Sequence, residues 1–572
     1  MICFLLHGPC TAPPTTVVLV MCPFVFLHHN SRPPSAIAML HALDLDEIKK
    51  LIGVFLSPAE VAVCCRVSRD WHASFRPLLW THVELKDTRQ LPPADQLQAH
   101  STLIRTLRYA GKFPAEYFHL TNCRRLVSLG VLSPSSSNWD QNCLVALIQH
   151  APALIRLELF YLRGQTIERN VYHAISSSRT LTTLWLNGVS FGHSDVAALI
   201  QTCAQRIVAL RLEQINMPSQ RYFLGEGAGM AVPPMFRIQD LHFQDMRGMG
   251  AQDQFQWMRR CPNLKSFFWR GCWLPRVSYV FPVQEFNTAL HARTWPDLKT
   301  LDVSGGEFVD EQLATLITGQ SRFHFEHLLV PRTGFGPLSL HALVQSELYL
   351  SITALELYAC ENVSSPMIQQ MLTMMPALRY FSAGILRVED MVQVSPCVSI
   401  STFTSDTGHA SFPAAATTIT STTTTTLVTR PWACHHLRTL KLCLDMNVDA
   451  NPRTSEFDLV QQHVFRQIAV LSKLETLELG RHFLADTGQA SLPQPKTRQL
   501  EYRLAAGLGH WTSLKRLCIL LFRPGQTMGI REIDWMIQAW PQLKVVSKYL
   551  NIDYDINYPL MRRLTHAGIT CV

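Results

Sequence analysis

The sequence predicts an α/β protein: a small three-helix module, then a long array of strand–helix repeats with a curved parallel sheet and outer helices. Three observations predict it. The chain has 572 residues, more than the ~250–300 that one hydrophobic core usually supports. Residues 41–85 have apolar positions at helical spacing. A Leu-x-x-Leu-x-Leu phrase then recurs along the rest of the chain.

The first 40 residues are assigned to neither region. Their apolar stretch TTVVLVMCPFVFL, at 15–27, is short and contains Pro, which does not fit a spanning helix. AIA at 36–38 resembles a signal cleavage site, but no Lys or Arg precedes the apolar stretch. We expect residues 1–40 to be a disordered leader, or a mis-assigned start with the true one at Met39. A cleaved signal peptide is the alternative.

Residues 41–85 are predicted to form three short helices. Asp44 fits an N-cap with Glu47 at the capping-box spacing. Ser57, followed by a Pro and by a Glu at N3, starts the second helix, and Ser68 caps a third that ends near Trp80. A domain this small rarely stabilises itself by more than ~3–5 kcal/mol. We therefore expect apolar surface to remain for a partner.

The stretch LDLDEIKKLIGVFLSPAEVAVCCRVSRDWHASFRPLLWTHVEL resembles an F-box, in the form common to fungal F-box proteins with leucine-rich repeats. Asp46 stands where the family usually has Pro. The resemblance implies docking onto the Skp-type adaptor of a cullin–RING ubiquitin ligase, with Trp71 and Trp80 packed internally. An ordinary helical cap on the following domain is the alternative. The matching positions are Leu43, Leu45, Glu47, Ile48, Ile52, Leu56, Val61, Cys65, Val67, Ser68, Trp71, Phe75, Leu79 and Trp80. The adaptor-binding residues that it implies are Leu45, Glu47, Ile48, Ile52, Leu56 and Val61.

About fifteen copies of the repeat phrase follow, from IRTLRY (104–109) through LIRLEL (154–159), LKTLDV (298–303), LETLEL (474–479) and LKRLCI (514–519) to LKVVSK (543–548). The commonest spacing is 26–27 residues, inside the ~20–29 range of leucine-rich repeats. Each Leu-x-Leu is a short strand with one buried face, and the preceding run is an amphipathic helix. Such units are stable only when stacked. Cys272 and Cys360 lie where these repeats place Asn or Cys after the strand.

The domain plan is a leader (1–40), the helical module (41–85), repeats (100–390), an insertion (391–431), and further repeats with a C-terminal cap (432–572). The insertion contains TTITSTTTTT and is rich in Ser, Thr and Pro, a composition that predicts disorder.

Alternate residues between the buried Leu positions are predicted to point outward from the strands. They mix aromatic and charged types, which binding hot spots favour. The target-binding candidates are Glu158, Phe160, Trp185, Arg211, His242, Phe268, Arg270, Asp302, Glu356, Tyr358, Lys441 and Glu478; Asn187, Glu213, Gln244 and Ser304 share their face.

Catalytic and nucleic-acid functions find no support. GxSxG, HExxH and P-loop spacings are absent, and GEGAG (225–229) lacks a strand-to-helix context. HFEH (324–327) starts a predicted strand, where alternation separates its ligands. The net charge of +8 is spread over the whole chain without a dense basic run. We expect no enzyme activity, cofactor, metal, nucleic-acid or membrane binding, and reduced thiols in an intracellular protein.

The resulting hypothesis is a cytoplasmic or nuclear substrate-recognition subunit of an SCF-type (Skp–cullin–F-box) ubiquitin ligase. The module would bind the Skp adaptor of the cullin complex, and the repeats would bind an unknown target protein. One alternative is a repeat scaffold without a ligase role. Another is a receptor that holds a small ligand between the repeats and a target.

Overall fold

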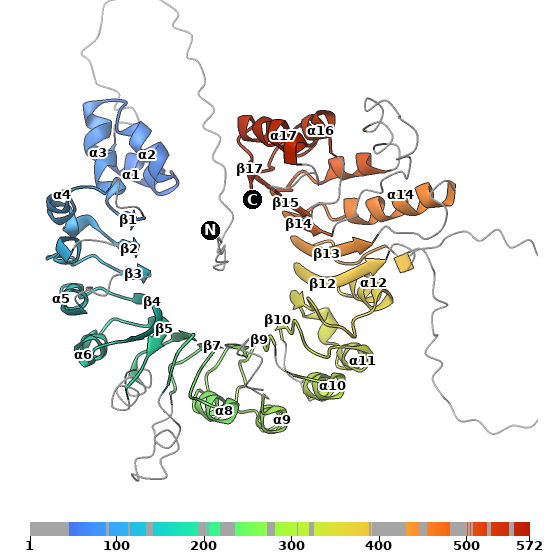
Figure 1. The fold of residues 1–572 in the computed structure, drawn as a ribbon, viewed down its shortest axis with the longest axis horizontal. Coiled ribbons are helices and arrows are strands. Elements are labelled where there is room, and N and C mark those ends of the chain that lie inside the picture. The colour runs from blue at the N-terminus through green and yellow to red at the C-terminus, as the bar shows by residue number, and fades with distance from the viewer. Residues whose placement is uncertain are drawn as a thin grey trace, which may run out of the picture. The chain divides into compact units, whose positions relative to one another are not determined.

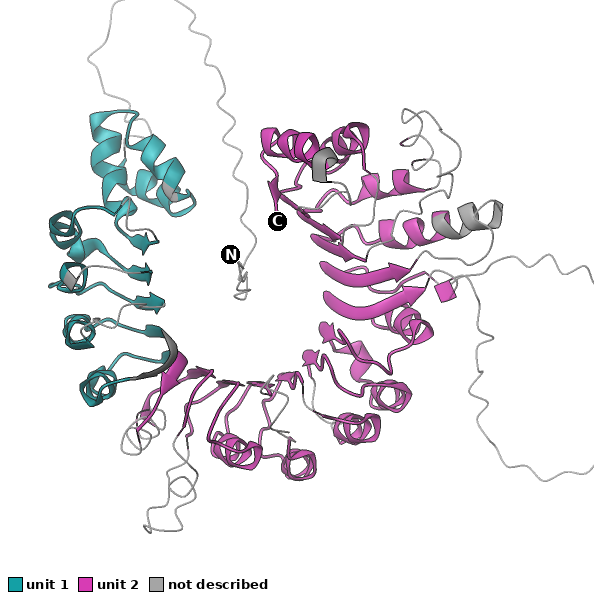
Figure 2. Ribbon diagram, viewed as in Figure 1, with its two compact units in different colours: residues 1–184 teal, residues 185–572 magenta. Residues whose placement is uncertain are grey.

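The computed structural model describes most of the chain after residue 44. The predicted leader, Asp44, Cys272, the GEGAG stretch and residues 392–430 of the predicted insertion lie outside the described residues. The chain divides into two compact units, residues 1–184 and 185–572, and the boundary falls within β5 (Thr183–Ser190) (Figure 2). The described residues are 45–86, 91–111, 115–132, 141–192, 202, 205–217, 235–271, 281–305, 307–319, 325–387, 390–391, 431–445, 455–480, 500, 504, 507–522, 528–547 and 554–572.

Unit 1 begins with the predicted three-helix module: α1 (Asp46–Val54), α2 (Pro58–Cys64) and α3 (Arg69–Leu79). The capping box of α2 forms as predicted, because the Glu60 amide donates to Ser57 Oγ at 3.3 Å and the Ser57 amide to Glu60 Oε2 at 2.7 Å. Ser68 likewise accepts from the Trp71 amide at 3.1 Å. The predicted start of α1 is wrong: its N-cap is Leu45, which has no side-chain oxygen to offer.

Polar contacts and a close approach hold α1 against α3. Lys49, 1% exposed, forms an ion pair with Asp70, and Ser74 Oγ donates to Asp46 Oδ1 at 2.5 Å. A Cβ at Gly53 would overlap the Leu78 side chain. A larger residue at this position would require the Leu78 side chain to shift.

Parallel strands follow in unit 1, each paired with the next in chain order. Helices α4 to α6 lie on the outer side of these strands (Figure 1). The elements are β1 (His82–Leu85), α4 (Ala94–Ala99), η2 (Ser101–Leu103), β2 (Thr106–Ala110), η3 (Ala115–Phe118), β3 (Ser128–Leu132), α5 (Gln141–Gln149), β4 (Arg156–Thr166) and α6 (Arg169–Ser177).

Unit 2 continues the strand–helix alternation, with its strands on the inner side of an arc and its helices on the outer side (Figure 1). Helices are about 10 Å wide whereas strands repeat every ~4.8 Å, so stacking bends the array toward the strands. Its first elements are β6 (Ala209–Glu213), β7 (Asp240–Gln244), α8 (Ala251–Arg259), β8 (Ser266–Arg270), α9 (Val283–His291), β9 (Thr300–Asp302), α10 (Asp310–Thr318), β10 (His327–Leu329), α11 (Pro337–Gln345), η5 (Leu348–Leu350) and β11 (Ala354–Glu356). The others are α12 (Ser365–Met374), β12 (Tyr380–Arg387), β13 (Thr439–Asp445), α14 (Ser455–Ala469), β14 (Thr476–Leu479), η7 (Leu508–Ser513), β15 (Ile519–Phe522), α16 (Ile530–Ala539), β16 (Val545–Val546), α17 (Tyr554–His566) and β17 (Thr570–Cys571).

One buried residue per strand sets the register of unit 2. The fourth position of the repeat phrase is paired with its equivalent on the neighbouring strand, and all but the last of these side chains are at most 1% exposed. This confirms the leucine-rich-repeat fold predicted from the sequence. The aligned residues, which we call the Leu ladder, are Leu210, Leu241, Phe267, Leu301, Leu328, Leu355, Phe381, Leu440, Leu477, Leu520, Val546 and Cys571.

Three strands differ from the predicted phrases. The phrase at 514–519 is out of register: β15 starts at Ile519, and Leu520, not Leu517, occupies the ladder. β1 lies inside the stretch assigned to the helical module and pairs with β2 through Val83 and Leu107. β17 is an additional strand.

Side chains also link consecutive repeats. Asp310, at the start of α10, accepts from the amides of Gly336, Leu338 and Ser339 at 2.9 Å each, which caps the N-terminus of α11. Cys360, which the repeat pattern places after the strand, is buried and donates from Sγ to the Val330 carbonyl at 3.1 Å. These bonds satisfy backbone groups that the turns leave without partners.

Truncating the ladder should destabilise the protein. Leu301→Ala and Leu477→Ala should each lower the free energy of unfolding by about 2–5 kcal/mol, because both side chains are 0% exposed and leave a cavity. Denaturant unfolding measures this. Leu338→Ala, at a position 48% exposed on α11, is the matched control and should cost no more than about 0.5 kcal/mol. Equal midpoints for all three variants would contradict burial of the ladder.

Candidate functional site

The outward side chains of unit 2 form rows across neighbouring strands because the Leu ladder fixes their register. We call this surface the strand face. It brings most of the predicted target-binding residues of unit 2 together. Its central row consists of Arg211, His242, Phe268, Asp302, Leu329, Glu356, Ser382, Lys441 and Glu478.

Arg211 lies at one end of the row between an aromatic ring and a carboxylate. Its guanidinium carbon is 3.9 Å from the centroid of the Trp185 ring, and its Nε donates to Glu213. Asn187 Nδ2 donates to the other Glu213 oxygen at 2.7 Å. We expected Trp185 to face solvent, but Arg211 covers it and leaves it 7% exposed.

His242, the next residue in the row, is also more buried than predicted, at 9% exposed. Its ring stacks on Phe268 with centroids 5.4 Å apart and planes at 16°. Burial, with the positive charges of Arg211 and Arg270, holds the pKa of His242 well below its ordinary value. The imidazole is therefore neutral in the folded protein at pH 7.

Asp302 and Arg270 form a half-buried ion pair. Asp302 is 0% exposed, which corrects the prediction that it faces solvent. Arg270 Nη2 donates to Asp302 Oδ2 at 2.9 Å, and the Ser304 amide donates to Oδ1 at 3.1 Å. Burial lowers the pKa of Arg270, but the carboxylates of Asp302, Glu356 and Glu213 raise it overall above its usual value.

Glu356 lies on β11, and the side chain of Tyr380 hydrogen-bonds to it. Tyr380 comes from the neighbouring strand β12, and Tyr358, two residues after Glu356, is 44% exposed. Burial and the Asp302 carboxylate raise the pKa of Glu356, although Arg270 and Lys441 oppose the shift. The carboxylate is thus partly removed from water without a close cation.

Lys441 and Glu478 complete the row. Their charged groups are 3.7 Å apart, and Lys441 Nζ lies 5.8 Å from the centroid of the Tyr380 ring, within cation–π range.

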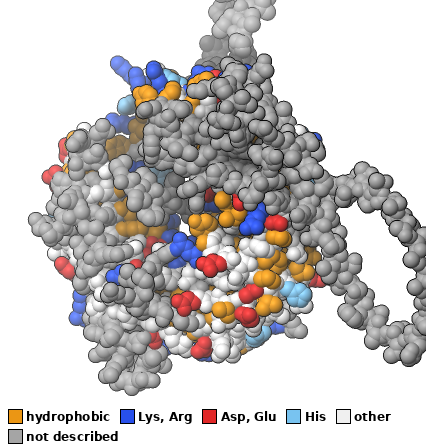
Figure 3. Space-filling model, turned by 45° about the vertical axis from the view of Figure 1, so that its right-hand side comes forward, with side chains coloured by type: hydrophobic (Ala, Val, Ile, Leu, Met, Phe, Trp, Pro, Cys, Tyr) orange, Lys and Arg blue, Asp and Glu red, His pale blue; other side chains and the backbone are white. Residues whose placement is uncertain are grey.

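Figure 3 shows acidic, basic and hydrophobic side chains interspersed on one side of the molecule. Mixed chemistry of this kind suits a protein partner.

The strands of unit 1 carry a separate charged group around the predicted residue Glu158, which is only 7% exposed. Arg156 and Arg108 both pair with its carboxylate, Arg108 at 3.8 Å. Gly130 lies between Arg108 and Glu158 in the register, and a Cβ there would come within 3.1 Å of Arg108 Cγ. The absence of a side chain lets Arg108 reach across β3. Phe160, also predicted, is half-buried at the next outward position of β4.

The helical module of unit 1 exposes a concentrated set of large hydrophobic side chains. Six of the 17 such side chains among the described residues lie within residues 45–67. Their exposed fractions are Leu45 42%, Leu51 59%, Val54 75%, Phe55 72%, Val63 62% and Val67 61%. We call this set the module patch.

The predicted adaptor-binding residues match the module patch only in part. Leu45 belongs to it and Glu47 is exposed, whereas Ile48, Ile52 and Leu56 are half-buried. The prediction that Val61 faces outward is wrong, because it is 4% exposed and packs inside the module. Leu51, Val54 and Phe55 were missed: the helical stripe that buries one side of α1 leaves these residues on the other.

The predicted target-binding residues also left out those at the third position of the Leu-x-x-Leu-x-Leu phrase. Tyr380 and Arg156 occupy it, and they contact Lys441 and Glu158 respectively. Strand alternation assigns this position to the same side as the fifth, so the signal was present in the sequence.

The HFEH stretch and the other potential metal ligands do not form a cluster in the described part of the chain. Glu326 pairs with Lys299 at 2.6 Å and His327 contacts Thr300 Oγ1 at 3.0 Å, so these HFEH residues are each engaged separately. No group of three potential metal ligands occurs in the described part of the chain, nor does any helix there have the length and apolarity to cross a membrane.

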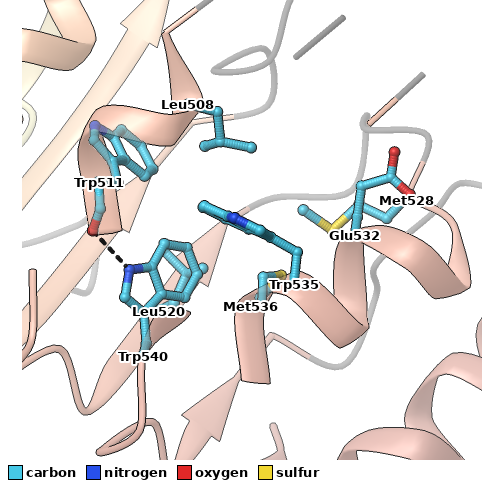
Figure 4. A pocket seen from close by; sticks show the side chains of 8 residues that line it. All are labelled: Leu508, Trp511, Leu520, Met528, Glu532, Trp535, Met536 and Trp540. Atoms are coloured by element: carbon cyan, nitrogen blue, oxygen red, sulfur yellow. Dashed lines mark hydrogen bonds between the residues drawn. The ribbon is translucent and has the colours of Figure 1, made fainter. Parts of the chain in front are cut away.

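An aromatic pocket lies between η7, β15 and α16 of unit 2 (Figure 4). Trp535 and Met536 approach it from α16, and Trp540 Nε1 donates to the Trp511 carbonyl at 3.0 Å. Its cavity volume is about 10 Å³, enough for about one water molecule. It gives no support to the small-ligand alternative.

Comparison with known proteins adds no family. No family model and no curated protein matches the chain. Solved structures with some likeness include a yeast Rad7–Elc1 complex, at TM-score 0.37 and 13% identity, covering 59% of this chain and 81% of that one. An internalin (InlF) from Listeria monocytogenes has a TM-score of 0.29 and 10% identity, and the match covers 78% of this chain and 88% of that one. A TLR13–ssRNA13 complex has a TM-score of 0.33 and 11% identity, and the match covers 82% of this chain and 64% of that one.

Acid should destabilise the strand face through His242. Its pKa is lowered by folding, so the unfolded chain binds a proton below about pH 6.5 that the folded chain does not. Stability contributed by the neutral ring is therefore lost as pH falls below that value, by up to about 1.4 kcal/mol per pH unit. His242→Phe should lose less unfolding free energy than wild type between pH 7 and 5.5. His341→Phe, at an exposed position, is the control; identical pH profiles for His242→Phe and wild type would refute the assignment.

Removing Arg270 should destabilise the protein because it leaves a buried carboxylate without its counter-ion. Arg270→Met keeps the alkyl stem but leaves Asp302 without a cation, and should lower the unfolding free energy by about 3–5 kcal/mol. Adding Asp302→Asn should recover most of this loss. Urea unfolding of both variants tests it, and a double variant no more stable than Arg270→Met would argue against the pair.

Proposed function

We propose that the chain is a non-catalytic recognition subunit of an SCF-type ubiquitin ligase. Its helical module would bind a Skp-type adaptor of the cullin complex, and the strand face would bind the target protein. The chain would contribute positioning, since holding a target beside a partner enzyme that carries ubiquitin by itself lowers the barrier to ubiquitin transfer. The cytoplasm or nucleus, where such ligases operate, is the proposed location.

The observation that carries the proposal is the module patch. Its members are each more than two-fifths exposed on a module of three short helices. Exposing apolar surface costs roughly 25 cal/mol per Å², so several large apolar side chains exposed on one small module are typical of an interaction site. The F-box resemblance of the same residues supports a Skp-type adaptor as its partner.

The strand face supports the second half of the proposal. Aromatic rings and guanidinium groups lie side by side there, for example Arg211 over Trp185 and Phe268 against His242. Their orientations are fixed by neighbouring contacts, so a partner meets a preorganised surface and loses less entropy on binding. A repeat scaffold without any ligase role remains the second candidate, because the strand face favours it equally.

An adaptor pull-down separates the two candidates. A purified Skp-type adaptor should bind the full chain and should not bind Val54→Asp/Phe55→Asp. These side chains are 75% and 72% exposed, so the two charges should weaken an apolar interface without unfolding the module.

Val309→Asp, at a position 51% exposed in unit 2, is the matched control and should bind normally. Circular dichroism and thermal unfolding establish that the variants are folded. Failure of every Skp-type adaptor to bind the wild-type chain would favour the scaffold and remove the ligase assignment.

A further inference from the structure

Charged groups on the strand face are mostly neutralised within the protein. Arg211 pairs with Glu213, Arg270 with Asp302, and Lys441 with Glu478. A partner gains little from charges that already have a counter-ion, because a new contact must replace an existing one.

Glu356 is the exception in the central row. No Lys, Arg or His nitrogen among the described residues lies within 4.0 Å of its carboxylate. Its row neighbours are Leu329 on β10 and Ser382 on β12, neither of which carries a charge. The Tyr380 side chain hydrogen-bonds to Glu356. A half-buried carboxylate is nevertheless more favourable when it also has a counter-ion, which a partner can supply.

The surroundings of Glu356 suit a side chain with an apolar stem and a cationic end. Leu329 is half-buried and in register with Glu356, which leaves part of its apolar surface accessible. Tyr358 is 44% exposed, so its ring is open to a partner, whereas Lys441 already lies within range of the Tyr380 ring. Aromatic rings attract cations, and the alkyl chains of Lys and Arg pack on apolar surface.

We propose that the strand face binds its target through a lysine or arginine side chain that pairs with Glu356 and packs against Leu329 and Tyr358. The proposal rests on the function given above, in that a protein target binds this face. Charge complementarity identifies the occupant: of the three carboxylates in the central row, Asp302 pairs with Arg270 and Glu478 with Lys441, which leaves Glu356 without an ion pair among the described residues.

Peptide selection on the intact chain tests this. Phage-displayed random dodecapeptides are selected on the immobilised full chain, and synthetic copies are titrated by fluorescence anisotropy. Enriched peptides should share a Lys or Arg, and Glu356→Gln should weaken their binding at least about tenfold, as loss of a partly buried charge pair does. Replacing the shared Lys or Arg by norleucine should have little further effect on the Glu356→Gln variant.

Glu361→Gln is the matched control, because it makes the same change at an exposed residue after the strand. It should leave affinity unchanged. Glu356→Gln should unfold at the same or a higher denaturant concentration than wild type, since it removes a half-buried charge that has no ion pair and keeps an oxygen that can accept the Tyr380 hydrogen bond.

The proposal is wrong if no peptide is selected, if the selected peptides share no basic residue, or if they bind Glu356→Gln as tightly as wild type. In the last two cases peptide recognition itself survives, so protein binding by the chain would stand. Failure of the adaptor pull-down would remove the ligase role and leave the Glu356 result unaffected.

Discussion

The structure of unit 2 depends on the Leu ladder. Each strand contributes one aligned apolar side chain that its own repeat cannot cover, so only the neighbouring repeats remove it from water. Because side chains alternate along a strand, a slip of one residue would turn the ladder outward and place Asp302 or Glu478 in the hydrophobic core instead. Hydrophobic burial therefore fixes the register, and the register fixes which charges meet on the strand face.

That register explains why the outward side chains are engaged more than a strand pattern alone suggests. Arg270 and Asp302 are 32 positions apart in the chain but on adjacent strands, where their side chains reach each other. In unit 1, Gly130 has no side chain to separate Arg108 from Glu158, so these residues on the strands on either side of β3 also reach each other. A surface held in this way is rigid, and specificity can reside in a charged group that has no ion pair among the described residues, such as Glu356.

Sequence reasoning reached the fold because the repeat phrase encodes burial directly. It failed at 514–519 because LKRLCI and LCILLF overlap, and Leu517 fits both phrases. It missed β1 because Trp80 and Val83 stand where the phrase expects Leu. For the site, alternation gave the direction of Asp302 and His242 correctly but not their burial. Their cover comes from long side chains on neighbouring strands, which no local pattern reveals.

The central claim is that a protein target contacts the strand face of unit 2. Site-specific photo-crosslinking in cells tests it most directly, with a benzophenone amino acid at Tyr358 on the strand face or at Leu350 on the helix side, positions 44% and 48% exposed. The account predicts a discrete crosslinked protein from position 358 and none from position 350. A crosslinked partner from position 350, with none from position 358, would contradict it.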